Sequence, residues 1–547
     1  MQKETLLQLS PKEAADAASI SERIASHWGL DKKKITGFEI LKRSIDARKR
    51  NVLINLKVNA FIDEPFFQTP LSGFEFPEVH RAKKTTVIIG AGPAGLFAAL
   101  ELIQLGIKPI ILERGKDVRD RRRDLAILNR EGILNEESNY CFGEGGAGTY
   151  SDGKLYTRST KRGNVEKVMQ LLVHFGADPS ILFTAHPHIG TNKLPHIIQS
   201  IREQIKASGG EVHFQEKLID LQLEKEKIKA VICASGNRYE ADDIILATGH
   251  SAKDIYVLLN QKQILIEAKP FALGVRIEHP QALIDSIQYH CPVTIGRDPY
   301  LPPAAYALVE QVDGRGAFSF CMCPGGIIAT ASTTQGELVV NGWSPSKRNN
   351  PFANSGMVVQ VGLGDAYTAG DKGRGTRDGG RGTRDGGRGT RDGGRGTSNE
   401  LLLHHFQEEV ERKAFAAGGG NFVAPAQRMT DFVSGKTSSS LPDNSYLRGV
   451  HSINMKEVLP DFVFKTLQGA FKAFGKKMKG YFTEEAIIIA PESRTSSPVR
   501  IPRDAETLQH PQIKNLYPCG EGAGYAGGIV SAAMDGQKVA MSISINQ

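Results

Sequence analysis

The residues whose types and spacing could do chemistry begin with a glycine motif near position 90. Gly90, Gly92 and Gly95 follow the spacing GxGxxG, and Glu113 comes about 20 residues later. Gly90 permits a tight turn, Gly92 lets the backbone approach a pyrophosphate, and Gly95 lets a helix pack closely on a strand. The carboxylate of Glu113 can accept hydrogen bonds from both hydroxyls of a ribose, and it would repel a 2′-phosphate. These residues predict a site for a dinucleotide whose adenosine carries no 2′-phosphate.

The elements around this motif have the order that such a site requires. Residues 85–89 are β-branched and apolar, which is typical of a strand buried on both faces of a parallel sheet. A helix over about 93–105 would direct its N–H groups and its positive dipole end at phosphates, with Gly106 as its C-cap. A second strand over 109–112 then delivers Glu113. The spacing alone is weak, but the complete unit predicts an α/β Rossmann-like domain.

Two distant segments favour FAD over NAD. Residues 244–249 read as an apolar strand ending in a small-residue turn, after an alternating stretch at 217–239 that predicts an antiparallel meander. Residues 516–528, LYPCGEGAGYAGG, precede a helical run at 529–543. A flavin ring lies far from the adenine and needs a separate part of the fold to hold it. A plain NAD domain has no use for such a returning carboxyl-terminal segment.

That carboxyl-terminal segment offers contacts for a flavin. Glu521 comes just after a strand, where its carboxylate could bond the ribityl chain. The helix that begins near Ile529 would point its N-terminus at the pyrimidine end of the ring, where it would stabilise negative charge on the reduced flavin. The glycines that would let the backbone approach the flavin are Gly522, Gly524, Gly527 and Gly528.

Several segments together resemble a known family. They are GAGPAG (90–95), ERG (113–115), FGEGGAGTYSDGKL (142–155), LATGHSAKD (246–254), FALGVRIEHPQ (271–281), CPGG (323–326), SRTSSPVRI (493–501) and CGEGAGYAGGIVSAAMDG (519–536). On these motifs nearly the whole chain resembles the bacterial and plastid family of uncharacterised FAD-dependent, or NAD(FAD)-utilising, dehydrogenases. More remotely, it is similar to the p-hydroxybenzoate hydroxylase and succinate dehydrogenase flavoproteins. The resemblance implies noncovalent FAD and no agreed substrate.

In that broader group a glycine doublet downstream of the first βαβ unit contacts the cofactor. Gly145 and Gly146 match the doublet, and Thr149 and Ser151 offer hydroxyls beside it. The motif and the resemblance together give the expected FAD-binding residues: Gly90, Ala91, Gly92, Pro93, Ala94, Gly95, Glu113, Arg114, Gly145, Gly146, Thr149, Ala247, Thr248, Gly249, Gly520, Glu521, Gly527, Gly528 and Ile529.

Length and charge set the broad class. The 547 residues predict about three or four domains. A formal charge of +8 invites a nucleic-acid or membrane partner, but residues 373–397 alone contain seven arginines and three aspartates. The amino terminus lacks a basic region followed by an apolar one, and no stretch reaches the roughly 18 apolar residues of a membrane span. We therefore expect a cytoplasmic protein with no membrane partner.

The cysteines are few and widely spaced. Six cysteines in a chain of this length do not make a disulfide framework, and none has CxxC spacing, which argues against a disulfide reductase. Cys321 and Cys323 form a CxC pair before Pro324. A redox or metal pair is one interpretation, but CxC supplies too few ligands for zinc. Buried cysteines at a strand end are favoured, and no metal site is expected.

The order of the segments predicts three domains. A small α+β domain occupies 1–82, an FAD-binding domain is assembled from 83–268 and 486–547, and an inserted α+β substrate domain occupies 269–485. This layout places a substrate cavity at a domain boundary, where ligand sites are common. Strands of the inserted domain are expected at 271–277, 317–321, 327–331 and 338–342.

The first domain begins with a helix signal. Ser10, Pro11 and Glu13 form a capping-box pattern. The helix that they begin is predicted to run to Trp28, with Gly29 ending it. Strands are expected at 37–41 and 52–57.

A low-complexity repeat interrupts the inserted domain. Residues 373–400 repeat the unit GRGTRDG and contain no apolar residue. Two or three glycines per unit make order costly in entropy, so disorder is expected. An arginine-glycine tract can bind single-stranded nucleic acid, but this one lacks aromatic residues for stacking. A tolerated expansion of a surface loop is therefore favoured over a nucleic-acid partner.

The combined signals predict an enzyme, an FAD-dependent oxidoreductase of the dehydrogenase or reductase kind. It would move two electrons as hydride between flavin N5 and an unidentified small organic substrate. Arg494 and Arg500 suggest an anionic substrate, because a guanidinium matches a carboxylate, although surface arginines are an equal alternative. Further candidates to face the flavin ring are His250, Arg276, Cys323 and Tyr525. The sequence assigns no catalytic residue.

The electron donor and three alternatives stay open. Gly362 and Gly364 are followed by Asp365, so they do not form a second GxGxxG unit. NAD(P)H is a candidate only as a transient donor, and the substrate itself could reduce the flavin. The alternatives are a flavin-dependent monooxygenase, a nucleic-acid-modifying flavoprotein that uses the basic loop, and a non-enzymatic flavin redox sensor or scaffold.

Overall fold

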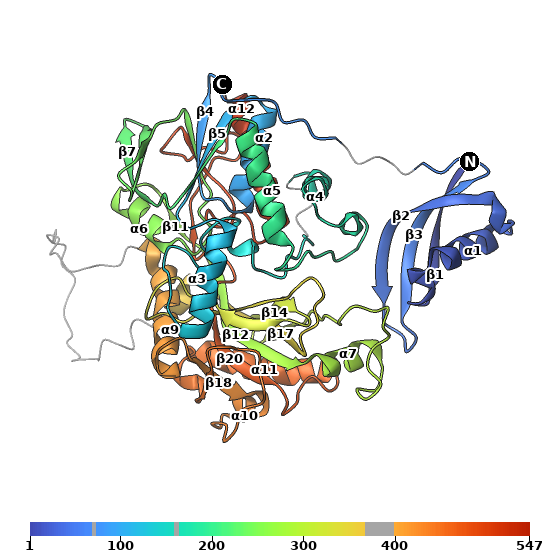
Figure 1. The fold of residues 1–547 in the computed structure, drawn as a ribbon. Coiled ribbons are helices and arrows are strands. Elements are labelled where there is room, and N and C mark those ends of the chain that lie inside the picture. Colours follow the sequence, from blue (N-terminus) through green and yellow to red (C-terminus); the bar gives the residue numbers. More distant parts are fainter. Residues whose placement is uncertain (68–72, 158–162, 367–398, 547) are drawn as a thin grey trace.

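The computed structural model describes residues 1–67, 73–157, 163–366 and 399–546. These residues form two large sheets with helices packed against them and a smaller amino-terminal unit at one side (Figure 1). The predicted disordered repeat over 373–400 lies outside the described residues up to position 398. Across the described ranges, no helix is both long and apolar enough to cross a bilayer.

The first large sheet is parallel and carries the predicted glycine turn. Its strand order is β22-β10-β4-β5-β6, and every neighbouring pair runs parallel. Its strands are β4 (Thr85–Ile89), β5 (Lys108–Glu113), β6 (Glu211–Phe214), β10 (Asp243–Leu246) and β22 (Leu516–Pro518). Strands β4 and β10 are almost entirely buried, as their apolar sequences predict. The predicted α/β class with a Rossmann-like sheet is confirmed.

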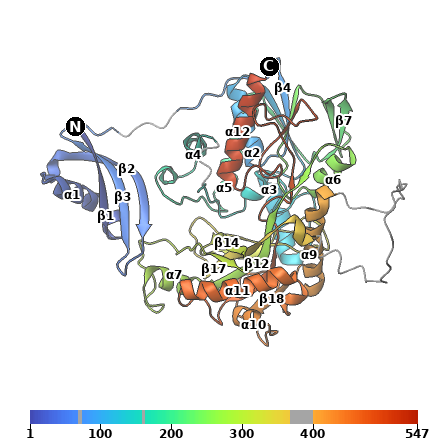
Figure 2. The same ribbon diagram turned by 180° about the vertical axis from the view of Figure 1, so that it is seen from behind.

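Two helices pack side by side against this sheet. Helix α2 (Pro93–Gln104) agrees with the predicted helix over 93–105, and α12 (Ile529–Ile545) agrees with the predicted run over 529–543 (Figures 1 and 2). Glycine residues allow α2 to pack closely on the turn after β4 and α12 to pack closely on α2. A Cβ at Gly95 would lie 2.0 Å from the carbonyl oxygen of Gly90, and a Cβ at Gly536 would lie 2.1 Å from that of Ala94.

The second large sheet is mostly antiparallel. Its order is β13-β14-β17-β12-β20-β18-β19, and only β18 and β19 pair in parallel. Its strands are β12 (Phe271–Pro280), β13 (Val309–Val312), β14 (Arg315–Cys323), β17 (Phe352–Val361), β18 (Ala424–Arg428), β19 (Val450–Ser452) and β20 (Ile487–Glu492). Helix α11 (Asp461–Lys477) buries its aromatic face in the same core. Strand β20 joins this sheet beyond the predicted boundary at 485, and the division into domains stays a prediction.

Shorter elements complete the two halves. The predicted meander over 217–239 is confirmed as β7 (Leu218–Glu224), β8 (Lys227–Cys233) and β9 (Arg238–Tyr239). The strands expected at 327–331 and 338–342 pair as β15 (Ile327–Thr330) and β16 (Val340–Trp343). The other elements are α3 (Val118–Glu131), α4 (Val165–His174), α5 (Leu194–Ala207), α6 (Lys253–Gln261), α7 (Gln281–Tyr289), α9 (Leu402–Gly418), α10 (Met429–Ser434), β11 (Glu267–Ala268) and β21 (Val499–Arg500).

The amino-terminal unit is a three-stranded antiparallel sheet with one α-helix. Its strands are β1 (Gln2–Leu9), β2 (Ile35–Asp46) and β3 (Leu53–Ile62) in the order β1-β3-β2, and its helix is α1 (Ala17–Trp28). The strands expected at 37–41 and 52–57 correspond to β2 and β3. Strand β1 was missed because its first half is polar and exposed.

The predicted helix start at Ser10 is wrong. Glu13 Oε2 accepts a hydrogen bond from Ser10 N at 2.9 Å, and Ser10 Oγ accepts one from Glu13 N at 3.3 Å, so the capping box does form. It opens only the 3-10 helix Glu13–Ala15, because Asp16 then adopts an extended conformation. The carboxylate of Asp16 caps α1 instead. The predicted end at Gly29 is confirmed, with a φ of 63°.

Candidate cofactor and active site

A cavity of about 370 Å³ lies at the carboxyl ends of strands β4, β5 and β10. Open parallel sheets bind ligands at this edge, because the turns that follow neighbouring strands converge there. The cavity extends to the second sheet, where β14 contributes Phe320 and Cys321. The expected FAD-binding residues that line it are Gly90, Gly92, Pro93, Ala94, Glu113, Arg114, Gly146, Ala247, Thr248, Gly249, Glu521, Gly527, Gly528 and Ile529.

Glycines along the cavity leave room for a ligand. A Cβ at Gly92, Gly249, Gly527 or Gly528 would meet no described atom within 4 Å, so each of these glycines borders open space. Gly90 has a different role. Its φ is 109°, and a Cβ there would lie 2.5 Å from the carbonyl oxygen of Ala247. The turn therefore needs glycine at position 90 because of the backbone conformation there. It needs glycine at position 92 because a side chain would fill space that is open to a ligand.

Two helix N-termini border the cavity. Pro93 is the first residue of α2 and Ile529 is the first residue of α12, and both line the cavity. Neither helix has a side-chain cap among the described residues. The first-turn N–H groups and the helix dipoles therefore favour negative charge at both places, as the pyrophosphate and the reduced ring of a flavin dinucleotide require.

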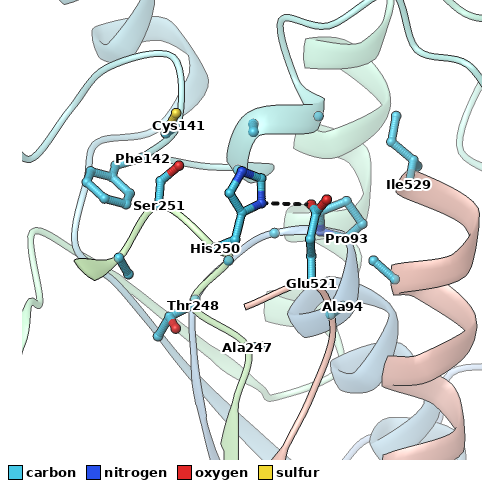
Figure 3. Close-up of a pocket in the computed structure, with 18 of the residues that line it drawn as sticks. Pro93, Ala94, Cys141, Phe142, Ala247, Thr248, His250, Ser251, Glu521 and Ile529 are labelled. Atoms are coloured by element: carbon cyan, nitrogen blue, oxygen red, sulfur yellow. Dashed lines mark ion pairs between the residues drawn. The ribbon is translucent and has the colours of Figure 1, made fainter. Parts of the chain in front are cut away.

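The loop after β10 and the segment after β22 meet on one side of the cavity. His250 Nδ1 lies 3.4 Å from Glu521 Oε2, and Figure 3 shows this ion pair between the two chain segments. Thr248 lines the same wall, and its buried hydroxyl has no hydrogen-bond partner among the described residues. An unsatisfied hydroxyl at the cavity fits a polar cofactor, because a buried polar group without a partner is costly.

Glu113 is tied to the protein more tightly than the sequence indicates. Its side chain is 5 % exposed and accepts hydrogen bonds from the backbone N–H groups of Ala91, Gly115 and Gly143, each at 2.9 Å. A carboxylate has about four lone-pair positions, so about one is left for a ribose hydroxyl. Glu113 thus fixes three turns of the cavity wall, and its contact to both ribose hydroxyls stays a prediction.

Arg114 and Phe142 form an apolar and charged platform near Glu113. The guanidinium of Arg114 lies 4.1 Å from the centre of the Phe142 ring. Arg114 also forms ion pairs with Glu137 at 2.6 Å and with Asp254 at 2.9 Å. The motif analysis missed Phe142 as a lining residue, although it opens the quoted segment FGEGGAGTYSDGKL.

Five expected cofactor residues do not line the cavity. They are Ala91, Gly95, Gly145, Thr149 and Gly520. Thr149 is fully buried, and its hydroxyl donates to the carbonyl of Glu144 at 2.7 Å. The expectation that this hydroxyl serves the cofactor is not supported, because the loop itself uses it.

The loop that carries the glycine doublet is built around a buried arginine. Arg121 of α3 is 0 % exposed, and its guanidinium donates to the carbonyl oxygens of Asn139, Tyr140, Gly143, Glu144 and Gly146. Only Gly146 of the doublet reaches the cavity, whereas the N–H of Gly145 donates to the carbonyl of Ala91 at 2.8 Å. Sequence reasoning had no signal for Arg121, because most of its hydrogen-bond partners are backbone carbonyl oxygens, with the Thr149 hydroxyl at 3.3 Å as a side-chain partner.

The arginines proposed for an anionic substrate are otherwise engaged. Arg494 lines the cavity but is 5 % exposed, and it pairs with both carboxylate oxygens of Glu411 at 3.2 and 3.1 Å. Arg500 does not line the cavity and lies over the ring of Tyr525. These contacts remove the argument from Arg494 and Arg500 for an anionic substrate.

The other sequence candidates divide between the cavity and the core behind it. His250 lines the cavity, whereas Arg276, Cys323 and Tyr525 do not. Arg276 is fully buried and pairs with Glu492 at 2.7 Å. The cavity is also lined by Lys154, Phe320, Cys321, Asn341 and Thr495, which the sequence analysis did not name as candidates to face the flavin ring.

A potential metal group lies away from the cavity, on α9. Ligand atoms of His404, His405 and Glu408 lie within 4.8 Å of one another. Lys253 Nζ and Arg412 Nη2 lie 3.6 and 3.7 Å from the same carboxylate. Two cations beside Glu408 oppose binding of a metal ion, so this group is better described as part of an ion-pair network.

Comparison with known families agrees with the fold and the cavity. Residues 84–269 match the pyridine nucleotide-disulphide oxidoreductase family, and residues 270–376 and 390–495 match the family described as FAD-dependent protein, C-terminal domain-like. Residues 1–61 match a domain of unknown function. The fold, the cavity and these matches define an FAD-dependent oxidoreductase, and its cofactor is FAD.

A relative covers almost the whole chain. The protein is 39% identical over 546 residues to an uncharacterized protein of Clostridium beijerinckii, and the alignment covers 96% of each chain. The chain therefore belongs to the same family as that protein.

Solved structures with similar folds are distant. CtdE in complex with FAD and a substrate is 9% identical, with a TM-score of 0.33 over 85% of this chain and 82% of that one. The tetracycline destructase is 11% identical, with a TM-score of 0.26 over 53% of this chain and 62% of that one. Thioredoxin reductase of Lactococcus lactis is 17% identical, with a TM-score of 0.18 over 30% of this chain and 36% of that one. At these scores no activity carries over to this chain.

Proposed function

We propose that this protein is an FAD-dependent dehydrogenase that transfers hydride between flavin N5 and a small organic substrate. The observation that carries the proposal is the shape of the cavity. It begins at the glycine turn after β4 and continues to a wall built by β14 of the second sheet, by β16 and by the segment after β20. Phe320, Asn341 and Thr495 in that wall offer apolar and polar contacts beyond those that a dinucleotide uses.

The cofactor would be held from both ends of the chain. Gly92 and the N-terminus of α2 would receive the pyrophosphate, and Glu521, positioned by His250, would bond the ribityl chain. The N-terminus of α12 would face the pyrimidine end of the ring. FAD supplies the two-electron chemistry, and the protein orients it and sets its electrostatic surroundings.

The residues of the far wall would orient the substrate. Lys154 is 36% exposed and forms an ion pair with Asp152 at 3.0 Å, so its ammonium group is fixed within the wall. Asn341 Oδ1 accepts a hydrogen bond from Arg276 Nη1 at 3.2 Å, which fixes the orientation of its amide. Fixed hydrogen-bond donors and acceptors beside the apolar ring of Phe320 would bind a substrate in one orientation.

The test is anaerobic bleaching of the yellow holoprotein. We expect an organic donor, or NADH or NADPH, to remove the absorbance of oxidised FAD in a saturable manner and without oxygen. Oxygen consumption that requires both NAD(P)H and a second organic compound would identify a monooxygenase instead and would overturn the dehydrogenase proposal. Absence of bound FAD from gently isolated or reconstituted protein would overturn the placement of the cofactor as well.

A further inference from the structure

Two thiols lie at a distorted end of strand β14. The pairing of β14 with β17 shifts register between Phe320 and Cys323, and Cys321 has a φ of 44°. A non-glycine residue in this left-handed region is strained, and such strain is concentrated at functional sites. In a regular strand, the side chains of residues 321 and 323 would share one face but stay too far apart for a disulfide. The register shift changes the positions of the two sulfur atoms relative to each other.

Two cations hold this pair. Lys154 Nζ lies 3.9 Å from Cys321 Sγ and 3.7 Å from Cys323 Sγ. Arg276 Nη2 lies 3.5 Å from Cys323 Sγ and donates to the carbonyl of Cys321 at 2.6 Å. The Cys323 thiol itself lies 3.3 Å from that carbonyl. Positive charge at both sulfurs favours the thiolate, which is the reactive form of cysteine.

The charges around the pair favour one negative sulfur. Within the described residues, the cations Lys154, Arg276 and Arg348 are paired with only two carboxylates, those of Asp152 and Glu492. One thiolate would balance the remaining positive charge. Other titratable groups that act on this cluster are His188, His250 and Tyr306.

The two thiols differ in access. Cys321 lines the cavity and is partly exposed, whereas Cys323 is fully buried behind it. A hydrogen bond from Cys323, together with the charges of Lys154 and Arg276, holds the pKa of Cys321 well below its usual range. Burial raises the pKa of Cys323. An accessible thiolate beside a buried thiol is the arrangement of a nucleophilic cysteine with a resolving partner.

Other cysteines lack these surroundings. Burial raises the pKa of Cys233 to about 12, and it also raises the pKa of Cys519 and Cys291. The thiol of Cys141, which lines another part of the cavity, donates to the carbonyl of Ala331 at 3.5 Å. The pair at 321 and 323 is therefore distinct in its charge and in its position at the cavity.

We propose that Cys321 and Cys323 form a redox-active pair that exchanges two electrons with FAD in this cavity. Oxidation of the two thiols joins the sulfur atoms in a disulfide and releases two electrons and two protons. FAD accepts both electrons and both protons and becomes FADH2, and the reverse reaction reduces the disulfide. The inference goes beyond the proposed function, because it assigns a second redox centre and depends on that function only for the cofactor.

The thiols can be followed directly in the full-length holoprotein. Cys321 and Cys323 are the only cysteines of the tryptic peptide 316–347, so an internal disulfide changes its mass by the loss of two hydrogens. We expect this peptide to be oxidised after mild treatment with diamide and to take up iodoacetamide at both sulfurs after reduction. A peptide that stays fully alkylatable after oxidant treatment, with the protein folded and yellow, would overturn the proposal.

Electron uptake tests the link to the cofactor. In an anaerobic dithionite titration, oxidised wild-type protein should accept about twice as many electrons per FAD as Cys321→Ser or Cys323→Ser, because a disulfide is a two-electron couple. Cys291→Ser is the matched control and should titrate like wild type. Equal uptake by wild type and by the serine variants, at equal FAD content, would overturn the proposal.

The two proposals fail in different ways. Protein without bound FAD would refute the cofactor placement, while the peptide measurement would still report whether the thiols form a disulfide. Yellow protein that is bleached by an organic donor, yet accepts no additional electrons, would support the proposed function and refute the thiol pair.

Discussion

At the scale of single residues, one side chain can decide which ligand the cavity accepts and how reactive a neighbouring group is. Gly92 borders open space at the start of α2, so a side chain there would occupy the volume that we propose for the pyrophosphate. Lys154 contacts two sulfur atoms and one carboxylate, so its single charge affects both thiols. Both effects are local and can be tested by substitution.

Gly92→Val should yield folded but colourless protein. The branched side chain projects into the cavity, and we expect the FAD content to fall by about tenfold or more. The measurement is the ratio of flavin to protein absorbance after purification. Gly73→Val is the control, because a Cβ at Gly73 also meets no atom of the described residues within 4 Å but lies away from the cavity. Full FAD content in Gly92→Val would contradict the placement of the pyrophosphate.

Lys154→Met should slow alkylation of Cys321 by iodoacetamide at neutral pH by about tenfold, because loss of the ammonium group raises the pKa of the thiol and lowers the fraction present as thiolate. Lys154→Arg keeps the positive charge and should restore most of the rate. The rate is followed by mass spectrometry of the tryptic peptide 316–347. Lys193→Met, at an exposed lysine outside the cavity, should leave it unchanged. Equal rates in wild type and Lys154→Met would show that the ammonium group does not stabilise the thiolate.

At the scale of elements, the shape of the cavity at the edge of the parallel sheet depends on how closely helices α2 and α12 pack. The N-termini of α2 and α12 reach the same cavity because the helices lie against each other on one face of the parallel sheet (Figure 2). Gly536 sits within α12 although glycine is a poor helix former, and the reason is that Ala94 of α2 leaves no room for a Cβ. Helix packing therefore sets the position of both dipoles at the cavity.

Gly536→Val should push α12 away from α2. We expect overpacking to lower the free energy of unfolding by about 1–3 kcal/mol and to weaken FAD retention, because both helix N-termini move. Thermal denaturation of the holoprotein, together with flavin fluorescence, measures the two effects. Lys538→Ala, at an exposed position of the same helix, is the control and should change neither. Wild-type stability in Gly536→Val would contradict the close contact.

At the scale of the whole molecule, a buried ion-pair network joins the cofactor half to the second sheet. Lys253 begins α6, directly after the cavity loop that follows β10, and its ammonium lies 2.8 Å from Glu411 of α9. Glu411 also pairs with Arg494, which follows β20. Burial opposes ionisation of Glu411, but the charges of Arg494 and Lys253 outweigh it and hold its pKa well below the ordinary value of 4.5.

Glu411→Gln should lower the free energy of unfolding at neutral pH by about 3 kcal/mol, because it removes the buried carboxylate that Arg494 and Lys253 share. Arg494 loses its nearest carboxylate, whereas Lys253 keeps its ion pair with Glu337 at 2.7 Å. A carboxyl with a lowered pKa contributes its full stabilisation above its ordinary pKa of 4.5 and loses it as the pH falls below that value. The difference between wild type and variant should therefore shrink at acidic pH. Denaturant titrations followed by tryptophan fluorescence at several pH values measure it.

Glu409→Gln on the same helix is the control for that experiment. Its ion pair with Lys413 is exposed, so its loss should change stability by at most about 1 kcal/mol. Equal effects of the two substitutions, or a difference that grows as the pH falls, would contradict the assignment of Glu411 as the buried centre of the network.

The sequence by itself determined the features that are local along the chain. Strand β4, the turn at Gly90 and Gly92, helix α2 and the arrival of Glu113 follow from residue types within one short segment, because strand, turn and helix preferences act over a few residues. The returning segment around Glu521 could be recognised for the same reason. The helix start was misplaced by a few residues, since Ser10 and Asp16 both offer caps and only the packed chain selects one.

Only the tertiary structure decided which distant residues share the cavity. It used Thr149 inside a loop, paired Arg494 with Glu411, and brought Lys154 to the two cysteines of β14. Arg494 and Glu411 are far apart in sequence, and so are Lys154 and the two cysteines. Their contacts depend on the packing of two sheets and on the cost of burying a charge without a counter-charge, and that cost is set by the three-dimensional surroundings of each group.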